Sequence, residues 1–182
     1  ADRVEAADAR AHLAVGDALH LERVQAAEIG DLVELAGLED DEDFVFIPRQ
    51  EPQAIKGSLL NLVCNELPRR YGFDPVRDLQ VITPMHRGAV CVGNLNARLQ
   101  AALNPPSPKK AERRLAGRVF RVGDRVIQHR NNYVHYVYNG DIGRLKSIDF
   151  NAHTLTLDID GRLVLYDWVD ADQLVMAYAV TV

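Results

Sequence analysis

The sequence lacks the features that direct a protein to a membrane or out of the cell. None of its apolar runs approaches the length of about 18 residues that a membrane-spanning helix needs. Its first residues, Ala1-Asp2-Arg3-Val4, do not have the basic-then-apolar pattern of a secretory signal. They also lack an initiating methionine, so we expect a processed chain or a piece of a longer one. From these absences we predict a cytoplasmic protein that does not bind membranes.

Cysteine is scarce, because the chain of 182 residues contains only Cys64 and Cys91. Two cysteines so far apart exclude a disulfide framework and a cysteine-based zinc site, and they suit a reducing compartment. His129 and His135 are too isolated to be proposed as metal ligands. We therefore predict no metal site in this chain.

Three catalytic signatures are absent as well. The sequence has no Gly-x-x-x-x-Gly-Lys-Ser/Thr loop, so the chain alone cannot hold a nucleoside triphosphate as P-loop proteins do. It also has no Ser-His-Asp pattern and no His-Glu-x-x-His motif. We predict no catalytic residue within this chain.

Charge is unevenly distributed along the chain. Residues 1–44 hold three basic and thirteen acidic side chains, whereas residues 45–182 hold 18 basic and 13 acidic ones. Residues 1–43 are rich in alanine and have leucines at loosely helical spacing, but the acidic run at 40–43 interrupts any packed element. This run lacks the ligand pattern of a calcium loop and fits a solvated linker. We treat residues 1–43 as a segment of uncertain fold.

The apolar periodicity predicts an α/β unit over residues 44–117. Residues 44–47 and 78–83 have the composition of buried strands. Between them, residues 53–68 have apolar side chains three and four positions apart, as in an amphipathic helix. A strand, a helix and a second strand in this order favour a parallel sheet. A further helix is expected over residues 93–104.

Beyond a basic, proline-rich linker at residues 105–110, the periodicity changes to that of short strands. Asn139-Gly140 and Asp160-Gly161 are two-residue turn signals and predict two hairpins. Several short strands separated by turns indicate a small all-β barrel over residues 118–172. Residues 173–182 are almost continuously apolar, which predicts a strand that returns to the parallel sheet.

The segment Thr83-Pro84-Met85-His86-Arg87-Gly88 follows a predicted parallel strand and precedes a predicted helix. Ligands of open α/β sheets bind at that edge, and the free N–H groups of a helix N-terminus attract anions. Arg87 can donate two hydrogen bonds to one phosphate, and Gly88 allows a close approach of the backbone. The segment is therefore either a phosphate site or an ordinary strand-to-helix loop.

Residues 109–130 carry eight basic and two acidic side chains, and Asn131-Asn132-Tyr133 and two further tyrosines follow them. Cations beside aromatic rings are typical of grooves that bind single-stranded nucleic acid, and small barrels often carry such grooves. A solvated positive surface with tyrosines in the core is the alternative. A third interpretation is a peptide groove lined by the tyrosines.

Several blocks of the sequence resemble the RecD-like DNA helicases of superfamily 1. In chain order, they are residues 78–88, 93–100, 121–128, 130–133, 138–143 and 174–182. The first two resemble the family's second motor domain, which has a RecA-like fold. The next three resemble the SH3-like barrel that is inserted in that domain, and the last resembles the strand that returns to it. The resemblance covers residues 44–182.

The resemblance implies a fragment of an ATP-dependent 5′–3′ DNA helicase of recombination and repair, similar to the exodeoxyribonuclease V alpha chain. ATP and Mg²⁺ would be cofactors of the parent enzyme, with neither bound by this fragment alone. The partners would be single-stranded DNA, the remaining motor domain and a recombination complex. The alternatives are a non-enzymatic nucleic-acid-binding module and a protein-interaction module that uses the barrel.

The resemblance also implies two sets of site residues. Those that would face the nucleotide cleft are Thr83, Met85, His86, Arg87 and Gly88. Those that would contact DNA are Arg121, Arg125, Arg130, Asn131, Asn132, Tyr133 and Asn139.

Overall fold

The computed structural model describes residues 11–14 and 47–181 of the chain. A small parallel sheet has β2 (Leu79–Ile82) at its centre, with β1 (Ala11–Ala14) on one side and β10 (Ala179–Val180) on the other. Both outer strands run parallel to β2, with Leu13 and Ala179 each opposite Val81. The predicted parallel sheet is therefore confirmed, and strands from the two ends of the chain lie on either side of its central strand.

The first segment of the chain differs from its helix-like sequence pattern where the structure describes it. Ala11–Ala14 forms a strand, because its backbone pairs with β2 along all four residues. The rest of residues 1–43 lies outside the described residues. So do residues 44–46 of the predicted strand at 44–47, and Ile47 itself lies in no strand.

A continuous helical run follows, as the apolar spacing of residues 53–68 predicts. It consists of α2 (Pro52–Asn61), a π-helical turn at Leu62–Glu66 and α3 (Leu67–Tyr71). Pro68 has no backbone N–H to donate to the preceding turn, and the wider turn ends two residues before it. The run ends at Gly72, whose φ of +73° is a left-handed conformation that glycine adopts without strain.

The core of this part lies between the helical run, the sheet and α4 (Val92–Leu103). Its largest contributors are the buried side chains of Leu59, Val63, Leu79, Val81, Leu95 and Leu99. They lie four residues apart on the helices, which bury one face, whereas the central strand β2 buries Gln80 on its other face as well. Helix α4 ends at Leu103, and Asn104 caps it directly before Pro105, close to the predicted end.

The barrel consists of a two-stranded hairpin and a five-stranded antiparallel sheet in the order β8-β7-β6-β5-β9. Its strands are β3 (Glu112–Leu115), β4 (Arg118–Arg121), β5 (Arg125–Gln128), β6 (Ile142–Asp149), β7 (Thr154–Ile159), β8 (Arg162–Asp167) and β9 (Leu174–Met176). A 3₁₀ helix, η3 (Trp168–Gln173), connects β8 to β9. The barrel core is formed by Phe120, Leu145, Leu155, Leu157 and Tyr166, none of which is accessible to solvent. The predicted small barrel is confirmed.

One of the two predicted hairpins is confirmed and the other is wrong. Asp160 and Gly161 have positive φ angles and form the two-residue turn between β7 and β8. Asn139-Gly140 does not join two strands, because residues 129–141 form a long connection between β5 and β6. We call this connection the 129–141 loop. Gly140 lies in a turn at its end, where its N–H donates to the Gln128 carbonyl at 2.9 Å.

The apolar run at the end of the sequence is not one strand, as predicted, but two. Leu174–Met176 pairs antiparallel with β5 in the barrel, and only Ala179–Val180 pairs with β2. The chain changes sheets at the buried residues Ala177 and Tyr178, which explains why the sequence is apolar throughout. Strands of the barrel sheets thus extend from residue 112 to residue 176, beyond the predicted limits at 118 and 172. The domain boundaries themselves remain predictions.

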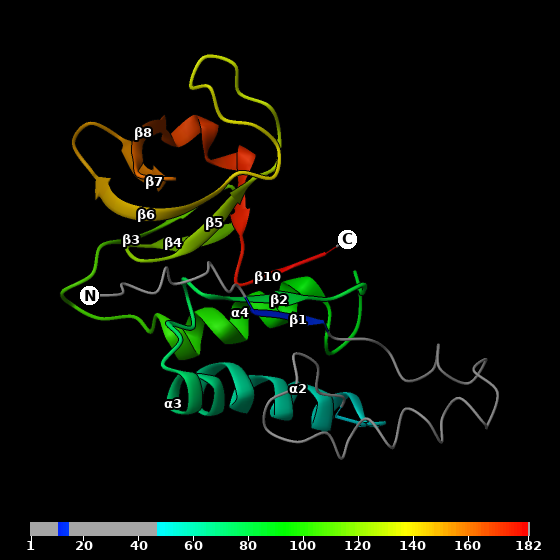
Figure 1. Ribbon diagram of the computed structural model, residues 1–182. Coiled ribbons are helices and arrows are strands. Elements are labelled where there is room, and N and C mark those ends of the chain that lie inside the picture. The colour runs from blue at the N-terminus through cyan, green and yellow to red at the C-terminus, as the bar shows by residue number, and fades with distance from the viewer. Residues whose placement is uncertain (1–10, 15–46, 182) are drawn as a thin grey trace, which may run out of the picture.

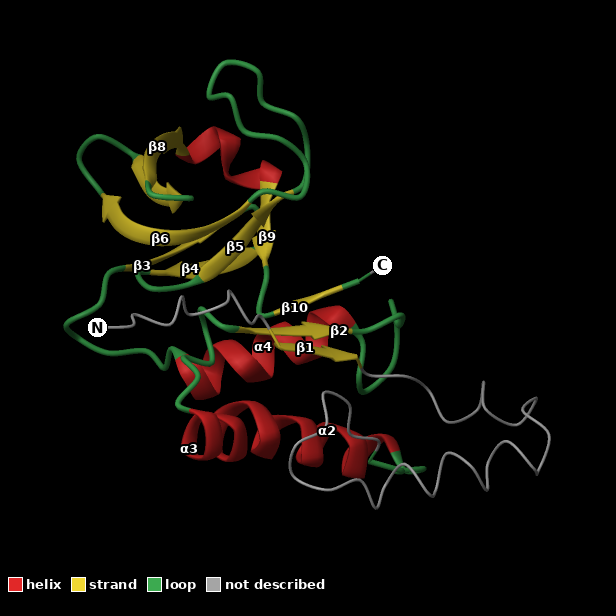
Figure 2. Ribbon diagram, viewed as in Figure 1, coloured by secondary structure: helices red, strands yellow, loops and turns green. Residues whose placement is uncertain are grey.

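Figure 1 shows the barrel on one side of the small sheet and helices α2 and α3 on the other. The 129–141 loop projects from the end of the barrel that lies farthest from the small sheet, and Figure 2 shows it as an extended connection without regular structure. Within the described residues, no helix is both long and apolar enough to cross a membrane.

Candidate nucleotide and nucleic-acid interfaces

The loop at the carboxyl end of β2 is held in place by Thr83. This side chain is completely buried, and its hydroxyl donates to the carbonyl of Val90 at 3.0 Å and accepts the N–H of Met85 at 3.3 Å. The backbone N–H of Thr83 donates to Val180 of β10. Thr83 therefore fixes the conformation of the loop from its buried side, and the Thr83 side chain does not face solvent.

Three of the predicted nucleotide-cleft residues, His86, Arg87 and Gly88, lie together on the exposed side of this loop. Gly88 has a φ of +96°, and its carbonyl accepts a hydrogen bond from Asn94 in the first turn of α4. The structure thus brings Arg87 to the carboxyl end of a parallel strand and next to a helix N-terminus, as the sequence pattern predicts. Met85 instead packs against the core of the α/β part. A phosphate contact at this loop stays a prediction.

Two of the arginines predicted to contact DNA join the barrel to the rest of the molecule. Arg121 is 7% exposed, and its guanidinium donates to the Glu112 carboxylate at 2.9 Å and to the backbone carbonyl of Asn104. Arg125 donates to the backbone carbonyls of Val76 and Leu79 at 2.9 and 2.7 Å. Hydrogen bonds from both guanidinium groups therefore join the barrel to the α/β part. We call this contact region the joint.

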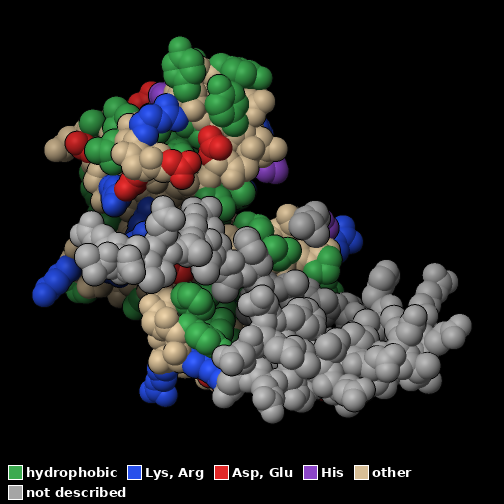
Figure 3. Space-filling model, in the orientation of Figure 1, with side chains coloured by type: hydrophobic (Ala, Val, Ile, Leu, Met, Phe, Trp, Pro, Cys, Tyr) green, Lys and Arg blue, Asp and Glu red, His purple; other side chains and the backbone are tan. Residues whose placement is uncertain are grey.

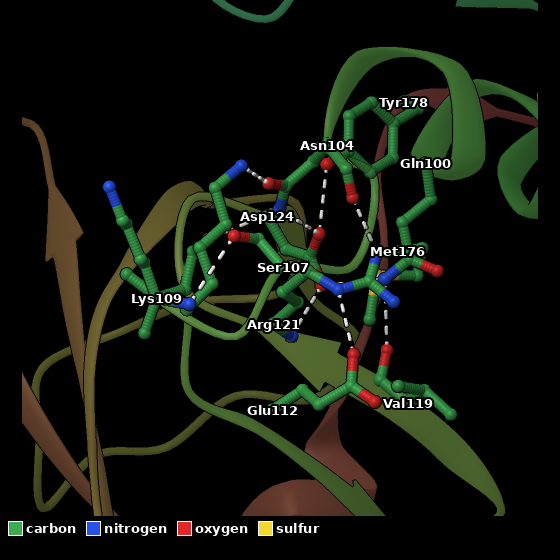
Figure 4. Close-up of polar contacts among 12 residues, drawn as sticks. Gln100, Asn104, Ser107, Lys109, Glu112, Val119, Arg121, Asp124, Met176 and Tyr178 are labelled. Atoms are coloured by element: carbon green, nitrogen blue, oxygen red, sulfur yellow. Dashed lines mark hydrogen bonds and ion pairs between the residues drawn. The ribbon is translucent and has the colours of Figure 1, made fainter.

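Asp124 lies at the centre of this joint (Figure 4). The carboxylate is completely buried and accepts four hydrogen bonds. Its Oδ2 accepts from Gln100 Nε2 and from the backbone N–H of Arg121, both at 2.7 Å. Its Oδ1 accepts from Asn104 Nδ2 at 2.7 Å and from the Tyr178 hydroxyl at 2.9 Å. We call Asp124 and these four partners the Asp124 cluster.

The Asp124 cluster connects three segments that are distant in sequence. Gln100 and Asn104 lie at the end of α4, Asp124 lies between β4 and β5, and Tyr178 lies between β9 and β10. Burial raises the pKa of the Tyr178 hydroxyl, and the negative charge of Asp124 beside it raises it further. The tyrosine therefore remains a neutral donor to the carboxylate at physiological pH. The sequence pattern did not single out this buried aspartate.

The 129–141 loop is shaped by its own asparagines. Asn131 accepts the backbone N–H of Asn139 at 2.9 Å, and Asn132 accepts that of His135 at 3.1 Å. Asn132 also donates to Gln173 at 3.0 Å. Five of the seven predicted DNA-contacting residues thus lie together in one loop, where Asn131 and Asn132 form bonds that hold its conformation.

Arg162 of β8 fixes the other side of the loop, and the sequence pattern did not identify it. Its guanidinium donates to the backbone carbonyls of His135 and Tyr136 at 2.8 and 2.7 Å. Tyr136 has a φ of +52°, an uncommon conformation for a residue with a side chain. A single guanidinium that binds two consecutive carbonyls explains how this conformation is maintained.

The loop presents aromatic rings to solvent. Tyr133 and Tyr136 are 70% and 69% exposed, and Tyr133 contacts Tyr138 edge-to-face with ring centroids 6.2 Å apart. Arg130, whose side chain is 65% exposed, lies at the start of the loop and pairs with Asp172 at 3.3 Å. Figure 3 shows hydrophobic side chains gathered over this end of the barrel. Exposed rings on a fixed backbone beside a cation can stack against the bases of an unpaired strand.

Cations gather on the β3–β4 hairpin and the segment before it. Lys109, Arg113 and Arg114 are exposed, and the Arg113 guanidinium lies 4.6 Å from the centroid of the Trp168 ring. The predicted basic stretch is therefore divided by the fold. Its first half lies on the surface, while Arg121 and Arg125 point into the joint.

Comparison with known proteins identifies the barrel. Residues 95–159 match the family described as the SH3 domain of ATP-dependent RecD-like DNA helicases. The chain is also 35% identical over 104 residues to a curated protein of Deinococcus radiodurans named "ATP-dependent RecD2 DNA helicase". That match covers 57% of this chain and 14% of the relative, so the chain spans a small part of the relative's length.

Solved helicase structures also match at low sequence identity. Unliganded Pif1 from Bacteroides sp is 17% identical, with a TM-score of 0.42, over 75% of this chain and 41% of that one. Bacteroides Pif1 bound to single-stranded DNA is 14% identical, with a TM-score of 0.37, over 69% of this chain and 35% of that one. On the sequence matches, the part of the chain that carries the barrel is similar to the SH3 domain of RecD-like DNA helicases.

Proposed function

We propose that this chain is part of an ATP-dependent 5′–3′ DNA helicase that acts in DNA recombination and repair, and that its barrel contacts single-stranded DNA. The observation that carries the DNA contact is the 129–141 loop. Its exposed Tyr133 and Tyr136 lie on a backbone that Asn131, Asn132 and Arg162 hold in one conformation. A fixed loop loses little conformational freedom when bases stack on it.

The same proposal places Arg87 and His86 at the nucleotide-binding cleft of the parent enzyme. Both are exposed at the carboxyl end of β2, where cationic and N–H donors favour a phosphate group. The chain lacks a P-loop, so the remaining motor domain would supply the rest of an ATP site. We assign no Mg²⁺ ligand, because the described residues contain no group of three or more histidine, cysteine or acidic side chains that could hold a metal.

Fluorescence anisotropy with a labelled single-stranded oligonucleotide tests the DNA contact. Replacing Tyr133 and Tyr136 by alanine removes both stacking surfaces, and each base stack is worth about 1–3 kcal/mol, so we expect at least about a fivefold rise in Kd. Tyr71→Ala is the matched control, because Tyr71 is 51% exposed on α3, away from the barrel. Equal binding by the double variant and the wild-type chain would exclude the loop as the contact.

Restoring the remaining motor domain allows the nucleotide assignment to be tested. In that longer protein, Arg87→Ala should lower the rate of ATP turnover while the oligonucleotide affinity of the barrel stays the same. ATP turnover that Arg87→Ala leaves unchanged would remove this residue from the nucleotide cleft.

A further inference from the structure

The edge strand β8 has one unpaired side. It pairs with β7 and lies at the end of the five-stranded sheet, and no other described strand pairs with it. In a hairpin with a two-residue turn, the residues that flank the turn exchange backbone hydrogen bonds, and so does every second pair after them. In the β7–β8 hairpin, the pairs that exchange hydrogen bonds are therefore Ile159 with Arg162, Leu157 with Val164, and Leu155 with Tyr166. The backbone N–H and C=O groups of Leu163 and Leu165 therefore point to the open side.

The side chains on this strand are unusual for an open edge. Val164 and Tyr166 are buried in the barrel, whereas Leu163 and Leu165 between and beside them are 67% and 54% exposed. Edge strands are normally protected by charged side chains, proline or bulges, because unpaired backbone groups beside apolar side chains pair with other strands. Residues 163–166 of β8 combine unpaired backbone groups with exposed apolar side chains.

The charges at the ends of β8 oppose nucleic acid and favour a basic peptide. Asp160 lies in the turn before the strand, and Asp167 is its last residue, so exposed carboxylates lie at both ends. The one cation of the strand, Arg162, donates to backbone carbonyls of the 129–141 loop. Carboxylates repel phosphates and attract lysine and arginine. This edge therefore differs in chemistry from the tyrosine-bearing loop.

We propose that the open edge of β8 binds an extended segment of another protein, which adds to the sheet as a further strand. The backbone groups of Leu163 and Leu165 would pair with the segment. Their side chains would contact apolar residues at alternate positions of the segment, and Asp160 and Asp167 would contact basic residues at its ends. The proposal does not depend on whether the 129–141 loop binds DNA.

Selection from a phage library of random peptides tests the proposal on the full 182-residue chain. The wild-type chain is the target, and Leu165→Lys is used for counter-selection, because a lysine on the edge blocks strand addition. We expect peptides with alternating apolar residues and basic ends, bound about tenfold or more weakly by Leu165→Lys. Val169→Lys is the matched control, since Val169 is 83% exposed but lies in η3 rather than on the strand.

A second variant addresses the backbone pairing directly. Leu165→Pro removes an N–H that points to the open side and leaves the pairing of Val164 with β7 in place. It should abolish peptide binding while the circular dichroism spectrum keeps its strand signal. Three results would overturn the proposal: enrichment of the same peptides by Leu165→Lys, equal weakening by Val169→Lys, or dimerisation through β8 in place of peptide binding.

Discussion

Replacing Asp124 by alanine should uncouple the barrel from the α/β part. The substitution removes a buried carboxylate and leaves four donors without their acceptor: Gln100 Nε2, Asn104 Nδ2, the Arg121 N–H and the Tyr178 hydroxyl. Gln100 Nε2 and Asn104 Nδ2 keep a second acceptor each, in the backbone carbonyls of Val119 and Val122. The Tyr178 hydroxyl and the Arg121 N–H therefore suffer most from the change.

The magnitude follows from these contacts. Hydrogen bonds to a charged group contribute about 1.5–3 kcal/mol each, and a buried donor without a partner costs about 1–3 kcal/mol. Two donors, the Tyr178 hydroxyl and the Arg121 N–H, lose their acceptor, so we expect Asp124→Ala to lower the free energy of unfolding by about 2–6 kcal/mol. Domains of this kind are stable by only about 5–15 kcal/mol, so the effect is large.

Urea unfolding followed by two probes measures this effect. Trp168 is the only tryptophan and lies in the barrel, so its fluorescence reports barrel unfolding, while circular dichroism reports the whole chain. We expect Asp124→Ala to lower the stability and to separate the two transitions. Asp149→Ala is the control, because that carboxylate is exposed and accepts the N–H groups of Asn151 and Ala152 in its own turn. A loss below about 1 kcal/mol for Asp124→Ala would refute the reasoning.

Four further predictions concern the rest of the chain. Burial raises the pKa of the Tyr166 hydroxyl to about 12, above its value in the unfolded chain. The neutral hydroxyl therefore contributes fully to stability below pH 10, and the free energy of unfolding should fall between pH 10 and 12. Thermal melts across that pH range measure this fall. Gly143→Ala should destabilise the barrel by about 1–3 kcal/mol in urea titrations, because the new Cβ would lie 2.7 Å from Ile159 Cγ1. Gly57→Ala should raise stability by about 0.5–1 kcal/mol in the same assay, since nothing lies within 4 Å of its Cβ position in α2. Arg162→Met should accelerate amide exchange in the 129–141 loop, and an unchanged exchange rate would show that its two carbonyl bonds do not order the loop.

The regular elements of the fold could be predicted because their apolar side chains follow one period. The β7–β8 hairpin and α4 bury one face with a repeat of two or of three to four residues, and β2 is a short apolar run that is buried on both faces. The final strand was predicted wrongly for a physical reason. Leu174 and Ala179 are both buried, but in different cores, and an apolar run does not reveal where a chain passes from one core to another.

The functional residues were harder to predict than the strands. A stretch of cations and tyrosines suggests a nucleic-acid surface, but its composition does not show which guanidinium groups face solvent. The fold places Arg121 and Arg125 at the joint, while Tyr133 and Arg130 stay exposed. No sequence pattern pointed to Asp124, because its side-chain partners come from two distant segments, the end of α4 and the connection between β9 and β10.

The proposed DNA contact is tested most directly by hydrogen–deuterium exchange of the chain, with and without a single-stranded oligonucleotide at low salt. We predict slower exchange in the 129–141 loop, weaker protection as the salt concentration rises, and no change along β8. Protection that is absent from the loop, or that a duplex competitor removes as readily as a single strand, would contradict the account.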